Sequence, residues 1–297
     1  MDGAARAHGL IPVMQNIPHA VPEVTLNDGT NVPALGLGTW HMGEHRDRAV
    51  DEAAVLRMGL DLGMTLVDTA EMYGDGGAER VVGDAIAADR DRVFVVSKVY
   101  PHNATAKGTI VACDRSLARL RTDRIDLYLL HWRGRHPLAE TVDAFERLRA
   151  AGKIVRWGVS NFDVGDIDEL LALPDGNRCA ANQVLYNLSQ RGVEFELRER
   201  CSRNDIVIMA YSPFQQGDLL RNRKLATLAA SLGMTAAQLA IAWLLAQSGT
   251  IAIPQSSNVD HVREFRAAAD VRLSPDALKM IDAAFPPPRS ARPLAML

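Results

Sequence analysis

Four side chains that can hold or move a proton follow apolar runs in the first half of the chain. Asp68, Lys98 and His131 each come directly after a stretch of apolar and β-branched residues, the composition of a buried strand. Tyr73 lies five residues after Asp68, before the glycine-rich segment 74–77. A carboxylate, an amine, an imidazole and a phenol together provide what general acid–base chemistry needs. Each also has an ordinary explanation, since Asp caps helices and turns, while Lys and His are often solvated or packed.

Strands and helices alternate along the chain around these residues, and this alternation predicts an α/β fold. The predicted strands are 34–40, 65–67, 93–97, 125–130, 154–160, 180–185, 206–211 and 250–253. The predicted helices are 46–64, 78–88, 106–120, 137–151, 167–173, 195–203, a segment 223–247 broken near Gly233, 259–269 and 276–285. Such strand–helix units form a single (β/α)8 TIM barrel, here with extra C-terminal helices. The carboxyl ends of barrel strands meet at one face, so the four side chains would share one mouth.

The two ends of the chain add further expectations. Residues 1–22 are predicted to be a loosely ordered N-terminal extension, and residues 23–297 to form the barrel domain. Asn-Asp-Gly at 27–29 predicts a β-hairpin that plugs the bottom of the barrel. The Pro-rich tail, 286–297, is expected to help close the pocket. A doubly wound sheet is the alternative architecture, but the Gly-Leu-Gly at 36–38 lacks the third glycine of its phosphate loop.

Composition and charge exclude several classes of protein. Of the 297 residues, 47% are hydrophobic and 23% charged, which suits a globular protein with a large core. A net charge of −3 argues against nucleic acid as a partner. No apolar segment reaches the roughly 18 residues of a membrane span, and residues 1–20 lack the apolar core of a signal peptide, so we expect a cytoplasmic protein with no membrane partner. The three widely spaced cysteines are expected to be free thiols, and no metal site is expected.

The set Asp68, Tyr73, Lys98 and His131 resembles the catalytic tetrad of the aldo-keto reductases, most closely that of the short-loop bacterial members. The resemblance extends over about residues 23–285. It implies reduction of aldehydes and ketones to alcohols with a nicotinamide cofactor, because no side chain carries hydride. The alternative is a non-catalytic nicotinamide-binding sensor or regulatory subunit on the same fold. The complete tetrad favours the enzyme.

By this resemblance Tyr73 donates the proton to the substrate oxygen. The pKa of a free phenol is about 10, and the cationic neighbour Lys98 is expected to lower it. Asp68 would pair with Lys98 and offset the cost of burying its charge. His131 is expected to hold or orient the substrate oxygen as a neutral imidazole.

Local motifs that match the family imply the cofactor contacts. Ser160 and Asn161 lie in a Gly-Val-Ser-Asn-Phe motif and Gln183 in an Asn-Gln pair, and the resemblance implies that these three hold the nicotinamide carboxamide. Tyr211, in Ala-Tyr-Ser-Pro, would stack on the nicotinamide face. The full set of expected cofactor contacts is Gly38, Thr39, Asp68, Ser160, Asn161, Gln183, Tyr211, Ser212, Phe214, Gln255, Ser256, Ser257, His261 and Glu264.

The segment after the eighth strand departs from the family pattern. Members specific for the phosphorylated cofactor have Lys after Ile-Pro and Arg six residues later, whereas this chain has Gln255 and His261. Fixed cations recognise a 2′-phosphate best, and His is only partly charged at neutral pH. Glu264 keeps the acidic position near the adenine, but Phe265 replaces the usual Asn. We therefore expect use of NADPH, NADP(H) being the family's cofactor, with relaxed discrimination and NADH, from the NAD(H) pair, as a second cofactor.

By the same resemblance, Trp40, Tyr100 and Trp132 line the substrate pocket above the nicotinamide. Apolar and aromatic walls suit small aldehydes and ketones. The loops after His131 and Tyr211 are short, which predicts an open, shallow site. The family leans monomeric, so we expect a monomer that acts on a small carbonyl compound.

Overall fold

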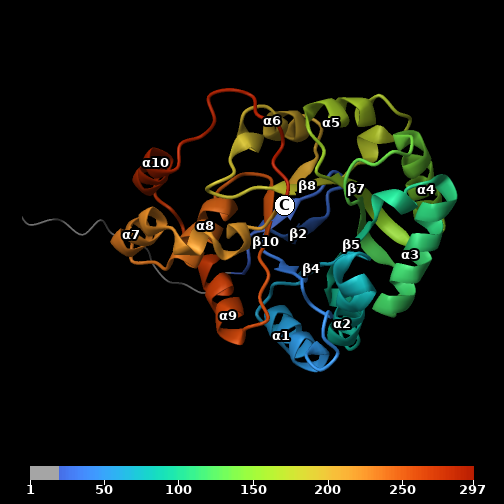
Figure 1. Ribbon diagram of the computed structural model, residues 1–297, viewed down its shortest axis with the longest axis horizontal. Helices are drawn as coiled ribbons and strands as arrows, with labels where there is room; N and C mark the ends of the chain where they lie inside the picture. Colours follow the sequence, from blue (N-terminus) through green and yellow to red (C-terminus); the bar gives the residue numbers. More distant parts are fainter. Residues whose placement is uncertain (1–19) are drawn as a thin grey trace, which may run out of the picture.

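In the computed structural model, which describes residues 20–297, eight parallel strands close into a barrel with helices outside it (Figure 1). The barrel strands are β3 (Leu37–Gly38), β4 (Leu66–Asp68), β5 (Phe94–Val99), β6 (Ile125–Leu130), β7 (Ile154–Ser160), β8 (Ala181–Leu185), β9 (Val207–Tyr211) and β10 (Thr250–Ile253). They follow one another in sequence order around the barrel. Bridges from Leu35 to Ala252 and from Gly38 to Gln255 join the first strand to the last, so the predicted (β/α)8 barrel is confirmed.

An antiparallel hairpin, β1 (Glu23–Thr25) and β2 (Asn31–Pro33), plugs one end of the barrel as predicted. Leu26 joins the apolar cluster inside the barrel. Asp28 in the turn accepts a hydrogen bond from Arg156 Nε at 2.6 Å, near the start of β7. The hairpin therefore covers the amino ends of the strands and leaves their carboxyl ends open. The predicted extension at 1–22 stays a prediction, because residues 1–19 lie outside the described part of the chain.

Ten α-helices in the described residues surround the strands, and several begin at a capping side chain. Their bounds are α1 (Ala49–Asp61), α2 (Gly77–Ile86), α3 (Ala106–Leu120), α4 (Leu138–Ala150), α5 (Val164–Leu171), α6 (Leu197–Ser202), α7 (Arg223–Ser231), α8 (Ala236–Leu245), α9 (Val259–Ala268) and α10 (Pro275–Ala284). Thr105, Asp163 and Thr235 accept hydrogen bonds from free backbone N–H groups at the starts of α3, α5 and α8. Within residues 20–297 no single helix has the length and apolarity of a membrane span, and α7 and α8 reach them only when counted together across a 79° bend.

Two elements differ in extent from the predicted ones. The predicted strand at 34–40 is a two-residue strand with a single bridge at Leu35, because its neighbours β4 and β10 pair with different short parts of it. The first helix begins at Ala49 rather than at residue 46. Val50 shares the helical spacing of the apolar residues in this segment, but it is 74% exposed, since Leu56 and Leu60 define the face that packs on the barrel.

The apolar core forms two layers, one inside the barrel and one between the strands and the helices. Phe145 and Trp157 are among the large residues of the outer layer, and both are fully buried. The inner layer includes Leu66, Val96, Leu127, Leu129, Ala181, Val207, Met209, Ile251 and Ile253. This inner layer fills the barrel from the hairpin upward, so side chains beyond it lie at the open mouth.

Candidate active site

Five barrel strands place a polar side chain at the next inward-facing position beyond this inner layer. Side chains alternate between the barrel interior and the helix layer along a strand, so a residue two positions beyond an interior residue also points inward. The pairs are Leu66 and Asp68, Val96 and Lys98, Leu129 and His131, Ala181 and Gln183, and Met209 and Tyr211. These polar groups therefore meet at the mouth of the barrel.

Lys98 contacts two of the other three predicted tetrad residues, Asp68 and Tyr73. Its Nζ is 2.7 Å from Asp68 Oδ2, 2.8 Å from the Thr69 carbonyl oxygen and 3.3 Å from the Tyr73 hydroxyl oxygen. Lys98 is fully buried and Asp68 is 3% exposed, so the ion pair is removed from water. The His131 ring lies edge-on to the Tyr73 ring, with centroids 5.7 Å apart. The structure thus brings the four side chains together.

Burial sets the protonation states of these groups. Burial lowers the pKa of Lys98, while the charge of Asp68 and the hydrogen bond to it act in the opposite direction. Burial, and after it the charge of Lys98, holds the pKa of His131 well below its ordinary value of 6.5, so the imidazole is neutral at pH 7, as expected.

The pKa of Tyr73 moves in the direction opposite to the expectation. Burial and the nearby charge of Asp68 raise it well above 10. The Lys98 ammonium is closer to the Asp68 carboxylate than to the Tyr73 hydroxyl, so its charge is largely matched before it can favour a phenolate. Tyr73 is therefore a phenol that keeps its proton until a strongly basic oxygen forms beside it.

A second group of polar side chains surrounds Asn161 and continues from the tetrad. The Tyr211 hydroxyl donates to Asn161 Oδ1 at 3.0 Å, and Asn161 Nδ2 donates to Ser160 Oγ at 3.2 Å. Gln183 Nε2 donates to Asp68 Oδ1 at 2.7 Å, which ties this group to the tetrad. An aromatic ring beside amide donors and acceptors suits a planar ligand that carries a carboxamide. These residues fit the predicted nicotinamide contacts.

Backbone strain gathers at the same mouth. A positive φ costs free energy for a residue other than glycine and is often found at functional sites. Four such residues border the cavity described next, namely His41, Asn161, Ser212 and Gln216, with φ of 69°, 58°, 51° and 52°. Asn161 and Ser212 directly follow β7 and β9, so the chain leaves these two strands in a conformation that the surrounding contacts must hold.

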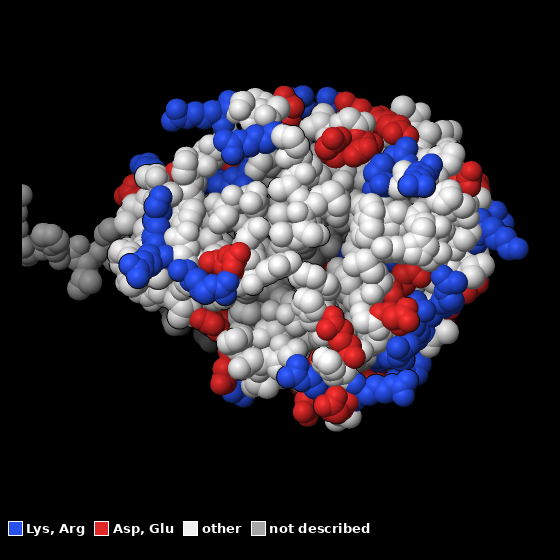
Figure 2. Space-filling view, in the orientation of Figure 1, with Lys and Arg blue, Asp and Glu red and all other residues white. Residues whose placement is uncertain are grey.

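The polar groups border a cavity of about 670 Å³ that runs from the tetrad to α9. Among the described residues that line it, none is Lys or Arg. Figure 2 shows the centre of this face uncharged, with Lys, Arg, Asp and Glu gathered around its edge. The predicted cofactor residues that line it are Gly38, Thr39, Asp68, Ser160, Asn161, Gln183, Tyr211, Ser212, Phe214, Gln255, His261 and Glu264.

Two predicted cofactor residues, Ser256 and Ser257, do not line this cavity. The Ser256 Oγ is 3.1 Å from His261 Nδ1, so it helps to orient a residue that does line the cavity. Ser257 is exposed to solvent. Glu264 Oε1 accepts a hydrogen bond from Thr235 Oγ1 at 2.5 Å, which fixes this carboxylate at the cavity edge.

Two of the three predicted substrate residues, Trp40 and Trp132, line the cavity. Tyr100 does not, because its ring packs edge-on behind Trp132 with centroids 4.9 Å apart. Tyr100 therefore supports the wall rather than forming it. Met72 also lines the cavity and was not predicted, although its position directly before Tyr73 was the available signal.

The segment between β9 and α7 is more folded than predicted. Residues 212–222 contain two 3-10 turns, Gln215–Gly217 and Leu219–Arg221. Gln216, Gly217 and Leu220 line the cavity. The expectation of a short loop and a shallow site is therefore wrong on this side. The leucine pair at 219–220, inside a polar stretch, was the sequence signal for a folded segment.

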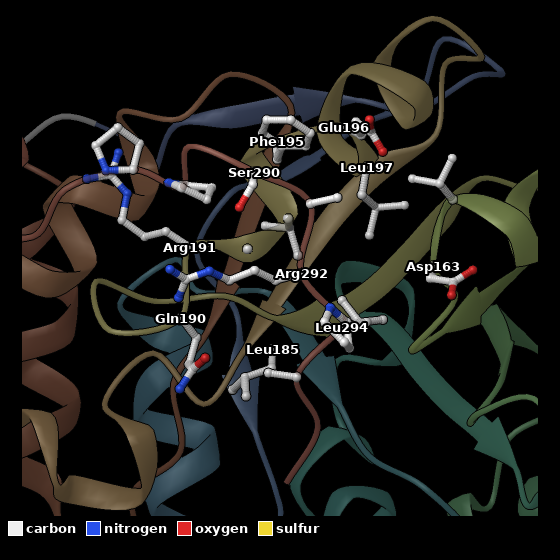
Figure 3. Close-up of a pocket in the computed structure, with 18 of the residues that line it drawn as sticks. Asp163, Leu185, Gln190, Arg191, Phe195, Glu196, Leu197, Ser290, Arg292 and Leu294 are labelled. Atoms are coloured by element: carbon white, nitrogen blue, oxygen red, sulfur yellow. The ribbon is translucent and has the colours of Figure 1, made fainter.

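The C-terminal tail crosses the mouth of the barrel (Figure 1). Its residues Met296 and Leu297 line this cavity, in agreement with the expected closure by the tail. Residues 286–295 border a second cavity, of about 430 Å³, between the tail and residues 189–197. Figure 3 shows this second cavity with Arg292 from the tail and Phe195 from the segment before α6. The tail thus contributes to two separate hollows.

A parallel barrel that gathers a buried Asp–Lys pair, a tyrosine and a histidine beside such a cavity has the site of an aldo-keto reductase. The fold alone would not decide this, because the barrel hosts many chemistries. The chain belongs to the aldo/keto reductase family, whose model matches residues 34–285.

Individual relatives are similar to nearly the whole chain. Methylglyoxal reductase YeaE of Escherichia coli strain K12 is 47% identical over 279 residues, which cover 92% of this chain and 98% of the relative. Glyoxal reductase of Bacillus subtilis strain 168 is 34% identical over 263 residues, covering 88% and 91%. A crystal structure of an aldo/keto reductase from Klebsiella pneumoniae in complex with NADP and acetate is 47% identical, with a TM-score of 0.90 and coverage of 93% and 99%.

Proposed function

We propose that this protein reduces aldehydes and ketones to alcohols, with NADPH as the hydride donor. The observation that carries the proposal is the 3.3 Å contact between Lys98 Nζ and the Tyr73 hydroxyl oxygen, beside the cavity. A phenol next to a buried ammonium can give its proton to an oxygen that gains negative charge. Family membership and relatives named methylglyoxal reductase and glyoxal reductase support the same activity.

The side chains divide the work of proton transfer. NADPH, when bound, supplies the hydride to the carbonyl carbon. As the carbonyl oxygen gains charge, the Tyr73 hydroxyl donates its proton to it, and the Lys98 ammonium stabilises the phenolate that remains. Asp68 holds Lys98 in place at 2.7 Å, and the neutral His131 donates a hydrogen bond to the same substrate oxygen. The phenolate then regains a proton from water.

The walls of the cavity favour small, uncharged carbonyl compounds. Trp40, Met72 and Trp132 line its substrate side, with Met296 and Leu297 from the tail, and all five are apolar or aromatic. Part of the volume must hold the cofactor, which leaves room for a substrate of a few carbon atoms or one ring. We therefore propose 2-oxoaldehydes such as methylglyoxal, the substrate in the name of a 47% identical relative, and aromatic aldehydes as substrates.

Cofactor discrimination is proposed to be weak. The described cavity lining contains no Lys or Arg, and His261 and Gln255 line it at the positions where phosphate-specific members of the family have Arg and Lys. A partly charged imidazole recognises phosphate less strongly than a guanidinium. We expect NADPH to bind more tightly than NADH by about tenfold or less, which corresponds to at most about 1.4 kcal/mol. Exclusion of NADH by a thousandfold or more would contradict this part of the proposal.

The test is the oxidation of reduced nicotinamide by methylglyoxal and by an aromatic aldehyde, followed with NADPH and NADH in parallel. Tyr73→Phe removes the proton donor and is expected to lower kcat by about 10²- to 10⁴-fold while leaving cofactor binding intact. Tight cofactor binding without turnover in the wild type would instead support a non-catalytic nicotinamide sensor.

We further propose that the chain acts as a monomer in the cytoplasm and binds neither nucleic acid nor membranes. The family resemblance, the net charge of −3 and three buried free thiols support this. Sedimentation velocity at micromolar concentration would test the monomer, and cell fractionation the location. A dimer that persists on dilution, or recovery with the membrane fraction, would contradict it.

A further inference from the structure

The turn that follows Tyr73 has an unfavourable backbone conformation that surrounding contacts must stabilise. After Tyr73, the consecutive residues Gly74, Asp75 and Gly76 all have positive φ, of 55°, 50° and 75°. This conformation is costly for Asp75 and persists only where surrounding contacts impose it. The helix α2 begins directly afterwards at Gly77. The position of the Tyr73 hydroxyl therefore depends on how the start of α2 is fixed.

A buried carboxylate on the first turn of α2 supplies such a fixing point. Glu79 is fully buried. Its Oε1 accepts from Ser97 Oγ at 2.6 Å, and its Oε2 accepts from Arg119 Nε at 2.5 Å. Ser97 belongs to β5 and Arg119 to α3, so Glu79 joins α2 to both neighbouring elements. We refer to Glu79, Ser97 and Arg119 as the Glu79 clamp.

The clamp lies directly behind Lys98. Ser97 precedes Lys98 on β5, and because side chains alternate along a strand, Ser97 points to the helix layer while Lys98 points into the barrel. The clamp therefore holds α2 to the residue of β5 that directly precedes Lys98. Arg119 also fills the space where a side chain on Gly76 would lie, so the clamp contacts the strained turn itself.

A second carboxylate anchors the other side of the Tyr73 segment. Glu71 Oε1 accepts from the backbone N–H of Tyr100 at 2.8 Å and from Asn103 Nδ2 at 2.9 Å. Tyr100 follows β5 directly. The segment with Tyr73 at its centre is thus tied at both ends to β5 and the loop that follows it. The Glu71 side chain is largely buried against that loop, and Glu79 is fully buried.

The charge of Glu79 also acts on Lys98. Burial lowers the pKa of Lys98, the Asp68 carboxylate raises it, and Glu79 adds to the effect of Asp68. A fully buried carboxylate costs several kcal/mol unless cations and hydrogen bonds compensate it. Arg119 and Ser97 provide that compensation for the Glu79 carboxylate.

We propose that Glu79 is a positioning residue for proton transfer: through Ser97 and Arg119 it holds the Tyr73 hydroxyl within reach of Lys98. The role rests on the proposed reductase function, because it assigns Glu79 to the geometry of the donor in that reaction. Glu79 touches neither the cavity nor the reacting atoms. Its loss should therefore lower the rate of chemistry without weakening cofactor or substrate binding.

The first variant is Glu79→Gln, which keeps the shape of the side chain and removes its charge and one acceptor. A displacement of a reacting group by about 1 Å lowers rates by up to about 10²-fold. We expect kcat to fall by about tenfold or more, with KM for methylglyoxal and the Kd of NADPH, measured by fluorescence, changed by less than about twofold. Ser97→Ala removes only the 2.6 Å hydrogen bond, should lower kcat in the same way, and guards against a Glu79 variant that does not fold.

The matched control is Asp126→Asn near the start of the neighbouring strand β6. Asp126 Oδ2 accepts from the backbone N–H of Val95 at 2.9 Å and from Arg90 Nη2 at 2.8 Å, so it too joins β5 to an arginine, but at the end of the strands opposite the mouth. Asp126→Asn should lower stability without lowering kcat. Equal effects of the two carboxylate variants on kcat would overturn the proposal.

A crystal structure of Glu79→Gln gives a readout that does not depend on turnover. The separation of Lys98 Nζ and the Tyr73 hydroxyl oxygen is 3.3 Å in the native chain and should increase beyond hydrogen-bond distance in the variant. An unchanged separation, or an unchanged kcat, would contradict the proposal that the Glu79 clamp positions Tyr73. If the wild type shows no turnover, the proposed function fails, and the crystallographic separation alone decides whether the clamp positions Tyr73.

Discussion

Replacing Lys98 by Met should lower the free energy of unfolding more than replacing an exposed lysine does. Lys98→Met keeps the length of the side chain and leaves the Asp68 carboxylate, 3% exposed, without its cation. Gln183 Nε2, at 2.7 Å, would remain as a side-chain donor to it. Breaking one partner of a buried ion pair costs about 3–5 kcal/mol, because the other charge stays desolvated. For a chain of this length, this loss lowers Tm by roughly 2–4 °C per kcal/mol.

The assay is equilibrium urea unfolding at pH 7, with equal m-values required for the comparison. Lys279→Met is the matched control, since Lys279 forms a 3.1 Å pair with Asp276 in which both side chains are more than three-quarters exposed. That control should cost less than about 1 kcal/mol. The contrast between the two lysines isolates the effect of burial from the effect of the substitution.

The double variant Asp68→Leu with Lys98→Met tests the reasoning from the other side. Removing both charges restores an apolar interior, which is often neutral or stabilising by about 1–4 kcal/mol, but it leaves Gln183 Nε2 and the Thr69 carbonyl without these partners, at about 1–3 kcal/mol each. The double variant should therefore be more stable than either single variant, and inactive. Single-variant losses below about 1 kcal/mol, with additive effects, would refute the claim that the pair is desolvated.

Three further outcomes are expected. Because the pKa of His131 is held well below 6.5, the imidazole binds a proton in mild acid in the unfolded chain but not in the folded chain. The free energy of unfolding should therefore fall by up to about 1.4 kcal/mol per pH unit below pH 6.5, and less steeply in His131→Gln. Urea unfolding at pH 7 and pH 5 would measure both. The three cysteines of the chain are buried, and burial raises the pKa of each thiol, so none should react with a thiol reagent at pH 8 until urea is added; rapid native labelling would disagree with the structure. Shortening Met296 and Leu297 to Ala should raise KM for apolar aldehydes several-fold with kcat nearly constant, and a fall in kcat alone would show that the tail acts on chemistry rather than on substrate contact.

The barrel and most of its mouth could be predicted because both depend on a short period in the sequence. Alternation along each strand fixes which residues face inward, so Asp68, Lys98 and His131 were bound to converge once the strands were placed. Positions that depend on contacts between loops could not be predicted in this way. Tyr100 directly follows β5, the strand that carries Lys98, yet its ring packs behind Trp132 and does not line the cavity.

Electrostatic features and long-range contacts could not be predicted from the sequence for a different reason. The raised pKa of Tyr73 follows from burial and from the distances that separate Lys98 from two partners, and neither is written in the spacing of residues. Glu79 and Arg119 are 40 positions apart, on α2 and α3 with β5 between them in the sequence, so no local pattern predicts their contact. The tail residues at the cavity depend on the path of the last 12 residues across the mouth (Figure 1).

The start of α2 has a consequence for how this protein can diverge. Gly77 lies directly against Gly43 of the loop after β3, and a Cβ on either residue would overlap the backbone of the other. No exchange at one position can be compensated at the other, since both already lack a side chain. In a saturation mutagenesis scan both should be as intolerant as Lys98, although neither lines the cavity. Such a contact would also leave no covariation between the two positions, so methods that infer contacts from paired substitutions would miss one that helps to hold the turn of Tyr73 in place.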